Sequence, residues 1–522
     1  MRSHARPPAR RRSPARVSSG SVTSGWRGAV MVCGTASDVG KSRLVAGLCR
    51  LLARNGVRVA PFKAQNMALN SFVTEAGHEI GRSQASQAMA AGVEPEAAMN
   101  PVLLKPNHDH TSQVVVMGRP VGTCDFGAYR DRAAELRPVV LVALADLRRR
   151  FEVVVCEGAG GAAEINLLDG DVVNLPLAAE AGVPVVLVGD IERGGVFAAL
   201  HGSVDLLPGR YRDCVRGFVV NKMRGDASWL SPGLAELERR HGIPVLGVLP
   251  FIDGVHLDAE DSLALGQGWP APSAWDPHED LDVAVVGLPR MSNVTDLDPL
   301  VTEPGVGVRL VRSPALGDPD LVVVPGTKAT VADLEWLEER GLARALGDAR
   351  RRRRGPVFLG LCGGGQMLGR KIHDPVESGR GWRAGLGLLE VDTVFEPDKV
   401  VRRRAGSALG APVHGYEIHH GRTRLGAAGA AWMALHDGGG VEHEGCRSDD
   451  GRVFGTSVHG LFESDDFRAA FLSEVAARRG KVRSRRGPSF AAVRAAHFDQ
   501  LADVVETHLD LDGLEAIVTG AG

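Results

Sequence analysis

Several features are missing from this 522-residue sequence, and each absence excludes a class of protein. No uninterrupted apolar run reaches the ~18 residues that a transmembrane helix needs, so we expect no membrane span. The seven cysteines form no C-x-x-C pair and their number is odd, which argues against a disulfide framework or a zinc site. Scattered cysteines of this kind favour reduced thiols in a cytoplasmic protein.

An excess of basic residues is also missing from most of the chain. The first 28 residues hold seven of the 61 Lys and Arg residues and no Asp or Glu, so 54 basic residues face 63 acidic ones in the rest. Because phosphate backbones are bound by surplus Lys and Arg, this acidic body argues against nucleic acid as a main partner. Residues 1–28 are rich in Arg, Ser, Pro and Gly without an apolar run, so we predict a disordered basic tail rather than a secretory signal.

The length of the chain and the order of its apolar runs indicate two domains in tandem. A single core stops growing near ~250–300 residues, which is well short of this chain. Within residues 29–255, and again within 281–510, short apolar runs alternate with helical patterns, which is typical of a buried parallel sheet in an α/β domain. Residues 256–280 contain Pro, Gly and charge without periodicity and are the predicted linker, and residues 511–522 are a predicted C-terminal tail.

The stretch GTASDVGKS, residues 34–42, lies between an apolar run and a helical pattern and predicts a phosphate-binding loop. Backbone N–H groups and a helix N-terminus would face the phosphates, Lys41 would reach the β- and γ-phosphates, and the Ser42 hydroxyl would bind Mg²⁺. The loop has one residue more than the usual spacing between its first Gly and the Gly-Lys pair. The residues that we expect to bind the nucleotide in this loop are Thr35, Asp38, Val39, Gly40, Lys41 and Ser42.

Two further polar residues follow apolar runs, at the carboxyl ends of predicted strands, where open α/β sheets bind their ligands. Glu157 ends the run FEVVVCE and is a candidate Mg²⁺ ligand of the nucleotide site. Lys63 lies in the polar loop PFKAQNMALNS, residues 61–71, and is a candidate for balancing the charge of a phosphate or of a substrate carboxylate. These residues therefore predict an ATP–Mg²⁺ site in the first domain.

The second domain contains a candidate nucleophile. In PVFLGLCGGGQMLG, Cys362 follows an apolar run and precedes small residues that begin a helix, a G-x-C-x-G pattern analogous to the G-x-S-x-G nucleophile elbow. Such a turn would leave the sulfur beside helix N–H groups that favour a thiolate. His459 ends the apolar run in RVFGTSVHGLF and is the candidate base.

These motifs resemble two known groups of enzymes. The spacing of the phosphate loop and the string EGAGG resemble dethiobiotin synthetase and its relatives, in which ATP phosphorylates a carboxylate; the likeness implies that Asn221 in FVVNK hydrogen-bonds adenine. The Cys362 elbow, His459 and the string PGTK at residues 325–328 resemble the triad (class I) glutamine amidotransferase domain. That likeness implies that Gly326 and Gly363 belong to the oxyanion hole.

One position departs from the usual pattern of this amidotransferase class. The expected His-x-Glu reads His459-Gly460-Leu461, so the acid that would orient His459 is missing there, and the group that orients it stays open. The cobyric acid synthase family also lacks this acid, and the sequence resembles that family from about Val30 to the C-terminus. The further strings that carry it are GRSQASQ, NPVLLKP, SQVVVMGRPVG, NKMRGD, AEDSLAL, MSNVTDLDPL and HGYEIHHGRT.

The family resemblance implies an α/β fold with an N-terminal, dethiobiotin synthetase-like P-loop domain and a C-terminal class I glutamine amidotransferase domain. It implies ATP, Mg²⁺ and L-glutamine, and a corrinoid substrate, adenosylcobyrinic acid a,c-diamide, whose b, d, e and g carboxylates become amides in cobalamin biosynthesis. Two alternatives stay open. One is a related amidoligase acting on the a and c carboxylates or on a cell-wall precursor; the other is a nucleotide-switch ATPase of the ParA/MinD type, whose signature lysine would fall at Ala36.

Overall fold

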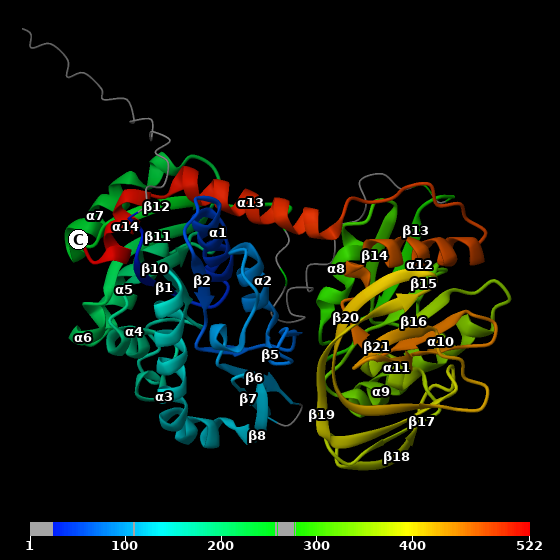
Figure 1. Ribbon diagram of the computed structural model, residues 1–522. Helices are drawn as coiled ribbons and strands as arrows, with labels where there is room; N and C mark the ends of the chain where they lie inside the picture. Colours follow the sequence, from blue (N-terminus) through cyan, green and yellow to red (C-terminus); the bar gives the residue numbers. More distant parts are fainter. Residues whose placement is uncertain (1–24, 108–109, 256–257, 259–275, 277, 522) are drawn as a thin grey trace, which may run out of the picture.

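The computed structural model describes residues 25–107, 110–255, 258, 276 and 278–521. These residues form two α/β domains that lie side by side, and a long helix near the C-terminus, α13 (Phe490–His508), runs from one to the other (Figure 1). The α/β architecture predicted for both parts of the chain is confirmed. Most of the predicted tail and most of the predicted linker lie outside the described residues.

The first domain is built on a sheet of six strands, in the order β12-β11-β10-β1-β9-β2, and every neighbouring pair is parallel. Its strands are continuous apolar runs because both faces of the sheet are covered by helices, as the sequence predicts. The strands are β1 (Gly28–Gly34), β2 (Val59–Phe62), β9 (Val153–Glu157), β10 (Val185–Asp190), β11 (Val215–Met223) and β12 (Val245–Pro250).

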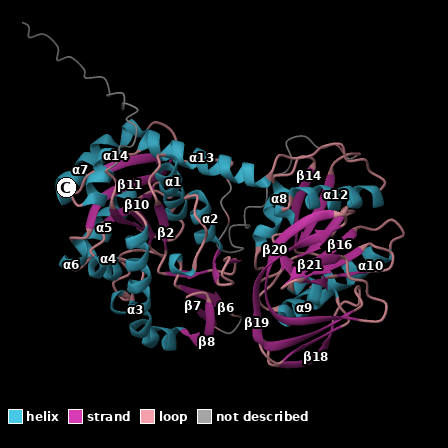
Figure 2. Cartoon of the chain, viewed as in Figure 1, coloured by secondary structure: helices cyan, strands magenta, loops and turns pink. Residues whose placement is uncertain are grey.

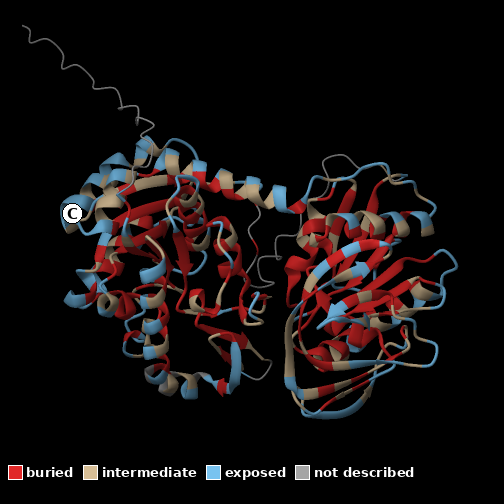
Figure 3. Cartoon of the chain, in the orientation of Figure 1, coloured by how far each residue is buried: buried red, intermediate tan, exposed pale blue. Residues whose placement is uncertain are grey.

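Alternate residues of β1 pack into two different cores. Met31 and Cys33 belong to the core under α3, α4 and α5, whereas Val30 and Val32 belong to the core under α1. The buried strands therefore lie between two layers of helices that are partly exposed (Figure 3). The helices of this domain are α1 (Lys41–Arg54), α2 (Arg82–Ala90), α3 (Phe126–Arg150), α4 (Leu175–Ala181), α5 (Val196–Leu206), α6 (Gly209–Arg212) and α7 (Ser231–His241).

Short strands extend the first domain toward the second. β4 (Ser71–Val73) pairs with β5 (Glu79–Gly81), and β4 also contacts two strands of the second domain, β19 (Val391–Ala408) and β20 (Ala411–Leu425). Polar loops that leave the carboxyl end of the main sheet are thus placed against the other domain. The remaining short strands form one small sheet of β3 (Gln65–Met67), β6 (Val102–Pro106), β7 (Thr111–Val116) and β8 (Arg119–Asp125).

The second domain contains a six-stranded sheet and a larger mixed sheet in which the long strands β19 and β20 stand out (Figure 2). The six-stranded sheet has the order β14-β13-β15-β16-β24-β23 and is parallel except for its edge strand β23. Its strands are β13 (Leu281–Val286), β14 (Val306–Val311), β15 (Leu321–Val324), β16 (Val357–Leu361), β23 (Cys446–Arg447) and β24 (Val453–Thr456). The mixed sheet adds β17 (Lys371–Asp374), β18 (Arg380–Ala384), β21 (Met433–Asp437), β22 (Gly440–Glu444) and β25 (Val458–His459).

Helices cover the six-stranded sheet on both faces, since Val283 and Val285 of β13 belong to one buried core and Ala284 and Val286 to another. Within the described parts of the chain, we find no helix with the length and apolar character needed to cross a membrane. The helices of this domain are α8 (Asp298–Val301), α9 (Thr330–Glu339), α10 (Leu342–Arg351), α11 (Gly363–Leu368) and α12 (Asp465–Arg478).

The C-terminal segment differs from the prediction, which gave residues 281–510 to the second domain and 511–522 to a tail. Most of α13 and the helix α14 (Leu511–Thr519) pack on the first domain, where Val505 and Val518 join the core under α1. An apolar helix face does not specify which sheet will receive it, and the sequence pattern alone therefore misassigns these helices.

The first described residues already belong to the folded domain, although the predicted tail extends to residue 28. Trp26 is 4% exposed and belongs to the core under α1, and β1 already begins at Gly28. A Cβ on Gly28 would lie 2.2 Å from the carbonyl oxygen of Val518, so the start of β1 packs closely against α14.

Candidate active sites

The predicted phosphate loop connects β1 to α1 and has Gly40 as the residue before the helix. Gly40 has a φ of 98°, in the region that favours glycine. A Cβ at this position would lie 2.2 Å from Nδ2 of Asn221, so only glycine fits. The Asn221 amide donates a hydrogen bond to the Val39 carbonyl at 2.8 Å and thereby holds the loop. Its contact with adenine stays a prediction.

Lys41 begins α1, and its side chain folds back over the loop. Its Nζ donates to the carbonyl oxygens of Ala36 and Gly160, each at 3.0 Å. Gly160 belongs to the EGAGG string that follows β9, so Lys41 connects the two segments from which the sequence predicts a nucleotide site. Thr35 and Asp38 lie in the same turn, where Asp38 adopts a left-handed φ of 57°.

Ser42, Lys63 and Glu157 lie together beside the loop. The Ser42 hydroxyl and the Lys63 ammonium both donate to Oε1 of Glu157 at 2.9 Å, and Gln87 donates to its Oε2. Burial alone would raise the pKa of Glu157, but Lys63 and these hydrogen bonds outweigh it and keep that pKa below its ordinary value. A hydroxyl next to a charged carboxylate is the hard oxygen donor set that Mg²⁺ prefers, so these residues fit the predicted ion.

In the second domain, the backbone turns sharply at Cys362, between β16 and α11. Cys362 has a φ of 47° and a ψ of −110°, a conformation that is rare and strained for a residue with a side chain. A Cβ on Gly364 would lie 1.9 Å from the Val324 carbonyl oxygen, and one on Gly360 would lie 2.6 Å from the Gly365 Cα. The glycines of the predicted elbow are therefore required by close packing around the turn.

His459 lies beside Cys362 and is held by an acid that the sequence motifs do not identify. Nδ1 of His459 is 2.7 Å from Oδ2 of Asp296, and the Gly460 N–H donates to Oδ1 of the same carboxylate at 2.7 Å. Asp296 belongs to a short 3-10 helix, η5 (Val294–Leu297), that follows β13. Asp296 lies in the string MSNVTDLDPL, but no local spacing connects that string to His459.

The surroundings of His459 keep its imidazole charged. Burial by itself would lower the pKa of His459, but Asp296 and the hydrogen bond with Cys362 outweigh burial and raise that pKa to about 10. The charged imidazole of His459 therefore lies between the Asp296 carboxylate and the Cys362 sulfur. This arrangement can hold a proton and deliver it to a leaving group.

The two predicted oxyanion-hole glycines flank this pair. A Cβ on Gly326 would lie 3.0 Å from Cε1 of His459, and a Cβ on Gly363 would lie 2.8 Å from Cγ2 of Thr327. The backbone therefore approaches closely from both β15 and the start of α11. Donation from these N–H groups to an oxyanion stays a prediction.

Cys362 lies at the junction of two cavities. The larger one, of about 520 Å³, is lined by polar side chains that include Glu417 and Glu444. The smaller one, of about 40 Å³, is lined by Ser292 and also by Lys105, which comes from β6 of the first domain. The cysteine thus faces a roomy pocket within its own domain and a small cavity at the contact between the domains.

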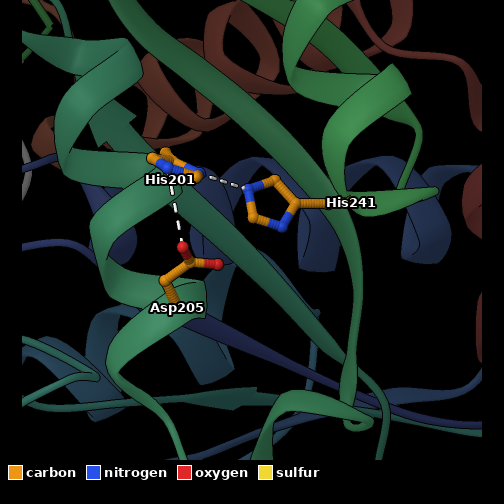
Figure 4. A group of neighbouring side chains, drawn as sticks. All are labelled: His201, Asp205 and His241. Atoms are coloured by element: carbon orange, nitrogen blue, oxygen red, sulfur yellow. Dashed lines mark hydrogen bonds and ion pairs between the residues drawn. The ribbon is translucent and has the colours of Figure 1, made fainter.

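A group of His and Asp side chains lies apart from both sites (Figure 4). Nδ1 of His201 is 2.8 Å from Nε2 of His241, and Nε2 of His201 is 3.6 Å from Oδ2 of Asp205. Helix α5 starts near the carboxyl ends of the parallel strands, where the phosphate loop also lies. The helix runs away from that loop, so its last turn lies toward the amino ends of the strands. The group therefore ties α5 to α7 and is no part of the nucleotide site.

Two family models match the chain. The one for the CobB/CobQ-like glutamine amidotransferase domain matches residues 282–467, and the one for the CobQ/CobB/MinD/ParA nucleotide binding domain matches residues 30–264. These two matches cover the candidate cysteine–histidine site and the phosphate loop, respectively.

Curated proteins with similar sequences agree with the family models. A cobyric acid synthase of Rhodococcus jostii (strain RHA1) is 52% identical over 95% of this chain and 96% of its own length. One from Nocardia farcinica (strain IFM 10152) is 52% identical over 94% of this chain and 97% of its own. Among solved structures, FtsY from Elizabethkingia anophelis in complex with GDP is 17% identical over 42% of this chain and 56% of its own, with a TM-score of 0.26, which carries no argument about function. From the matches along nearly its whole length, the chain belongs to the cobyric acid synthase family.

Proposed function

We propose that this chain uses ATP and glutamine to amidate the b, d, e and g carboxylates of adenosylcobyrinic acid a,c-diamide, in the cytoplasm. The observation that supports this most strongly is that one chain of the cobyric acid synthase family holds two distinct sites. One is a phosphate loop beside the paired side chains of Ser42 and Glu157, and the other is an elbow cysteine beside the charged His459.

The cysteine site supplies ammonia. The Cys362 sulfur attacks the carboxamide carbon of glutamine, and the C–N bond breaks as His459 gives its proton to the leaving nitrogen. Water then attacks the glutamyl thioester and returns a proton to His459, and the S–C bond breaks to release glutamate. Gly326 and Gly363 are the proposed N–H donors to the oxyanion formed in both steps.

The loop site activates the acceptor. A substrate carboxylate oxygen attacks the γ-phosphorus of ATP, the bond to ADP breaks, and an acyl phosphate forms. Ammonia attacks the acyl carbon, loses a proton, and displaces phosphate to leave the amide. Lys41 is proposed to balance phosphate charge, while Ser42 and Glu157 are the proposed ligands of Mg²⁺, which when bound supplies further positive charge at the phosphates.

Ammonia has to pass from one site to the other without being lost to water. The small cavity that touches both Cys362 and Lys105 is the proposed exit, because it faces the first domain. The larger cavity is the proposed glutamine pocket, since its polar lining suits an amino acid.

The test uses the purified full chain with ATP, Mg²⁺, glutamine and the a,c-diamide, and mass spectrometry counts the amides formed. We expect four amidations. Cys362→Ala is expected to abolish glutamine-dependent amidation and to leave ammonia-dependent amidation intact, because the thiol acts only in ammonia release. An unchanged diamide would contradict the proposed function, and loss of both activities in Cys362→Ala would contradict the division into two sites.

The alternatives predict different results in the same assay. A related amidoligase would leave the a,c-diamide unchanged and amidate cobyrinic acid or a cell-wall precursor instead. A nucleotide-switch ATPase would dimerise with ATP and form no amide. The matches to cobyric acid synthases and the amidotransferase domain do not favour a switch.

A further inference from the structure

One loop of the first domain reaches from the proposed nucleotide site to the histidine of the second domain. The loop, residues 63–71, begins with Lys63, which donates to Glu157 at 2.9 Å. It ends with Asn70 and Ser71, both 0% exposed. Within nine residues, therefore, the chain passes from the carboxylate beside the phosphate loop to the contact between the domains.

The end of this loop exchanges two hydrogen bonds with the segment that carries Asp296. The Ser71 N–H donates to Oδ1 of Asn293 at 2.9 Å, and the Val294 N–H donates to Oδ1 of Asn70 at 3.2 Å. Asn293 has a left-handed φ of 53°, which asparagine adopts more readily than most residues. Because Asn293 directly precedes η5, the loop fixes the start of the turn from which Asp296 holds His459.

A third contact connects the same loop to His459 itself. The Tyr416 hydroxyl donates to the Ser71 carbonyl at 3.0 Å. The Tyr416 ring stacks on the His459 imidazole, with centroids 5.6 Å apart and planes at 27°. The two residues are also direct partners in the pairing of β20 with β25. Ser71 therefore touches both the segment that orients His459 and the ring that packs on it.

Contacts on either side keep the loop seated. Arg403 of β19 donates to the Val73 carbonyl at 3.0 Å. Arg82 of α2, which is 1% exposed, donates to Glu463 at 2.6 Å, and Glu463 lies in the 3-10 helix η6 (Leu461–Glu463) that follows His459. Residues of the first domain thus contact the chain both before Asp296 and after His459.

We propose that Asn70, Ser71, Asn293 and Tyr416 are positioning residues for glutamine hydrolysis, which hold Asp296 and His459 in place from across the domain contact. This inference rests on the proposed function of Cys362 and His459. Its consequence is that the glutamine site is complete only while the loop of the first domain is docked, which confines ammonia release to the assembled enzyme.

The test measures glutamine hydrolysis and ammonia-dependent amidation in the full chain. Tyr416→Phe keeps the stacked ring and removes only the hydroxyl; Asn293→Gly keeps the left-handed backbone and removes the carboxamide side chain, including the acceptor oxygen. We expect each to lower kcat for glutamine hydrolysis about tenfold, because each leaves a buried polar group of the loop unpaired. The KM for glutamine and the ammonia-dependent rate should stay unchanged.

Two readouts separate positioning from general damage. In Asn293→Gly, the alkaline limb of the glutaminase pH profile should move to lower pH, because a displaced Asp296 no longer holds the proton on His459. Asn293→Asp restores an acceptor oxygen and should recover most of the lost rate. Matched controls in the first domain, Tyr211→Phe and Asn107→Ala, should behave as the unaltered chain, since their hydrogen bonds stay within that domain.

Wild-type hydrolysis rates in both Tyr416→Phe and Asn293→Gly would overturn the inference. Equal losses of glutamine hydrolysis and of ammonia-dependent amidation would also overturn it, because that pattern indicates a merely structural role. Should Asn293→Gly fail to fold, the single-oxygen change in Tyr416→Phe decides. Cys362→Ala in the same assay separates failure of the proposed function from failure of this inference. If Cys362→Ala still hydrolyses glutamine, the proposed function fails. If it does not, wild-type rates in the positioning variants count against the positioning role alone.

Discussion

At the scale of single residues, Asp296 determines the state of His459. The two residues are 163 positions apart, and the carboxylate makes a 2.7 Å contact with Nδ1 in a buried setting. The pKa of His459, raised to about 10, lies above the ordinary value of 6.5. The raised pKa of His459 therefore contributes stability that is fully present below its unfolded value of 6.5 and is lost as the pH rises through about 10.

Asp296→Asn is expected to lower kcat for glutamine by about 10²-fold or more, since the imidazole loses the carboxylate that orients it and keeps it protonated. Without the carboxylate the pKa of His459 falls, so the alkaline limb of the kcat/KM profile for glutamine should move to lower pH. A pH–rate series of glutamine hydrolysis measures both effects, and ammonia-dependent amidation should not change.

Asp298→Asn is a matched control two residues away. Burial, with a further contribution from Asp258, keeps the pKa of Asp298 well above its ordinary value, and an amide is close in size and shape to its carboxyl group. A glutaminase profile that is unchanged in Asp296→Asn, or that moves equally in both variants, would contradict the role of Asp296.

At the scale of elements, the close crossing of α1 and α13 shows how the C-terminus is attached to the nucleotide domain. A Cβ on Gly47 of α1 would lie 2.9 Å from Cγ2 of Val505 and 3.0 Å from the carbonyl oxygen of Leu501. Arg50 and Arg54 of α1 add ion pairs to α13. Glycine is therefore the residue that lets the two helices touch.

Gly47→Ala is expected to destabilise the chain by about 1–2 kcal/mol, because the clash with α13 exceeds the ~0.5–1 kcal/mol that alanine gains over glycine in a helix. Gly202→Ala in α5, where no atom outside the neighbouring helix backbone lies within 4 Å of the added Cβ, should instead stabilise by that smaller amount. Denaturant unfolding of both variants measures the free energies. Equal stabilisation in the two would contradict the close packing of α13 on α1.

At the scale of the whole molecule, the proposed chemistry depends on a passage between domains. The cavity shared by Cys362 and Lys105 holds only about 40 Å³, so one larger side chain can fill it. Ser292 lines this cavity and has a small side chain that is 9% exposed.

Ser292→Met is expected to uncouple the two reactions. Ammonia that cannot leave through the filled cavity escapes to solvent, so the ratio of glutamine hydrolysed to amide formed should rise above one. Simultaneous measurement of glutamate and amide gives that ratio. Ser473→Met, at an exposed position on α12, is the control, and an unchanged ratio in Ser292→Met would rule out this exit.

Local motifs were sufficient to predict the elements that carry the candidate site residues. The phosphate loop, the strand that ends at Glu157, the Cys362 elbow and the strand that ends at His459 each depend on neighbouring residues, so their positions follow from sequence patterns. Asp296 was missed because its contact with His459 is formed only by folding. Asn221 is predicted to hydrogen-bond adenine, and in the structure its amide donates a hydrogen bond to the Val39 carbonyl of the phosphate loop.

The sequence by itself determined two α/β domains, a nucleotide loop and an elbow cysteine, because each depends on the spacing of residues that are close along the chain. Only the tertiary structure decided which acid holds His459, which sheet receives α13, and how the loop of residues 63–71 meets the proposed glutamine site. The physical reason is that these contacts join residues far apart in the chain, and packing and hydrogen bonding across domains choose among partners that local patterns leave equivalent.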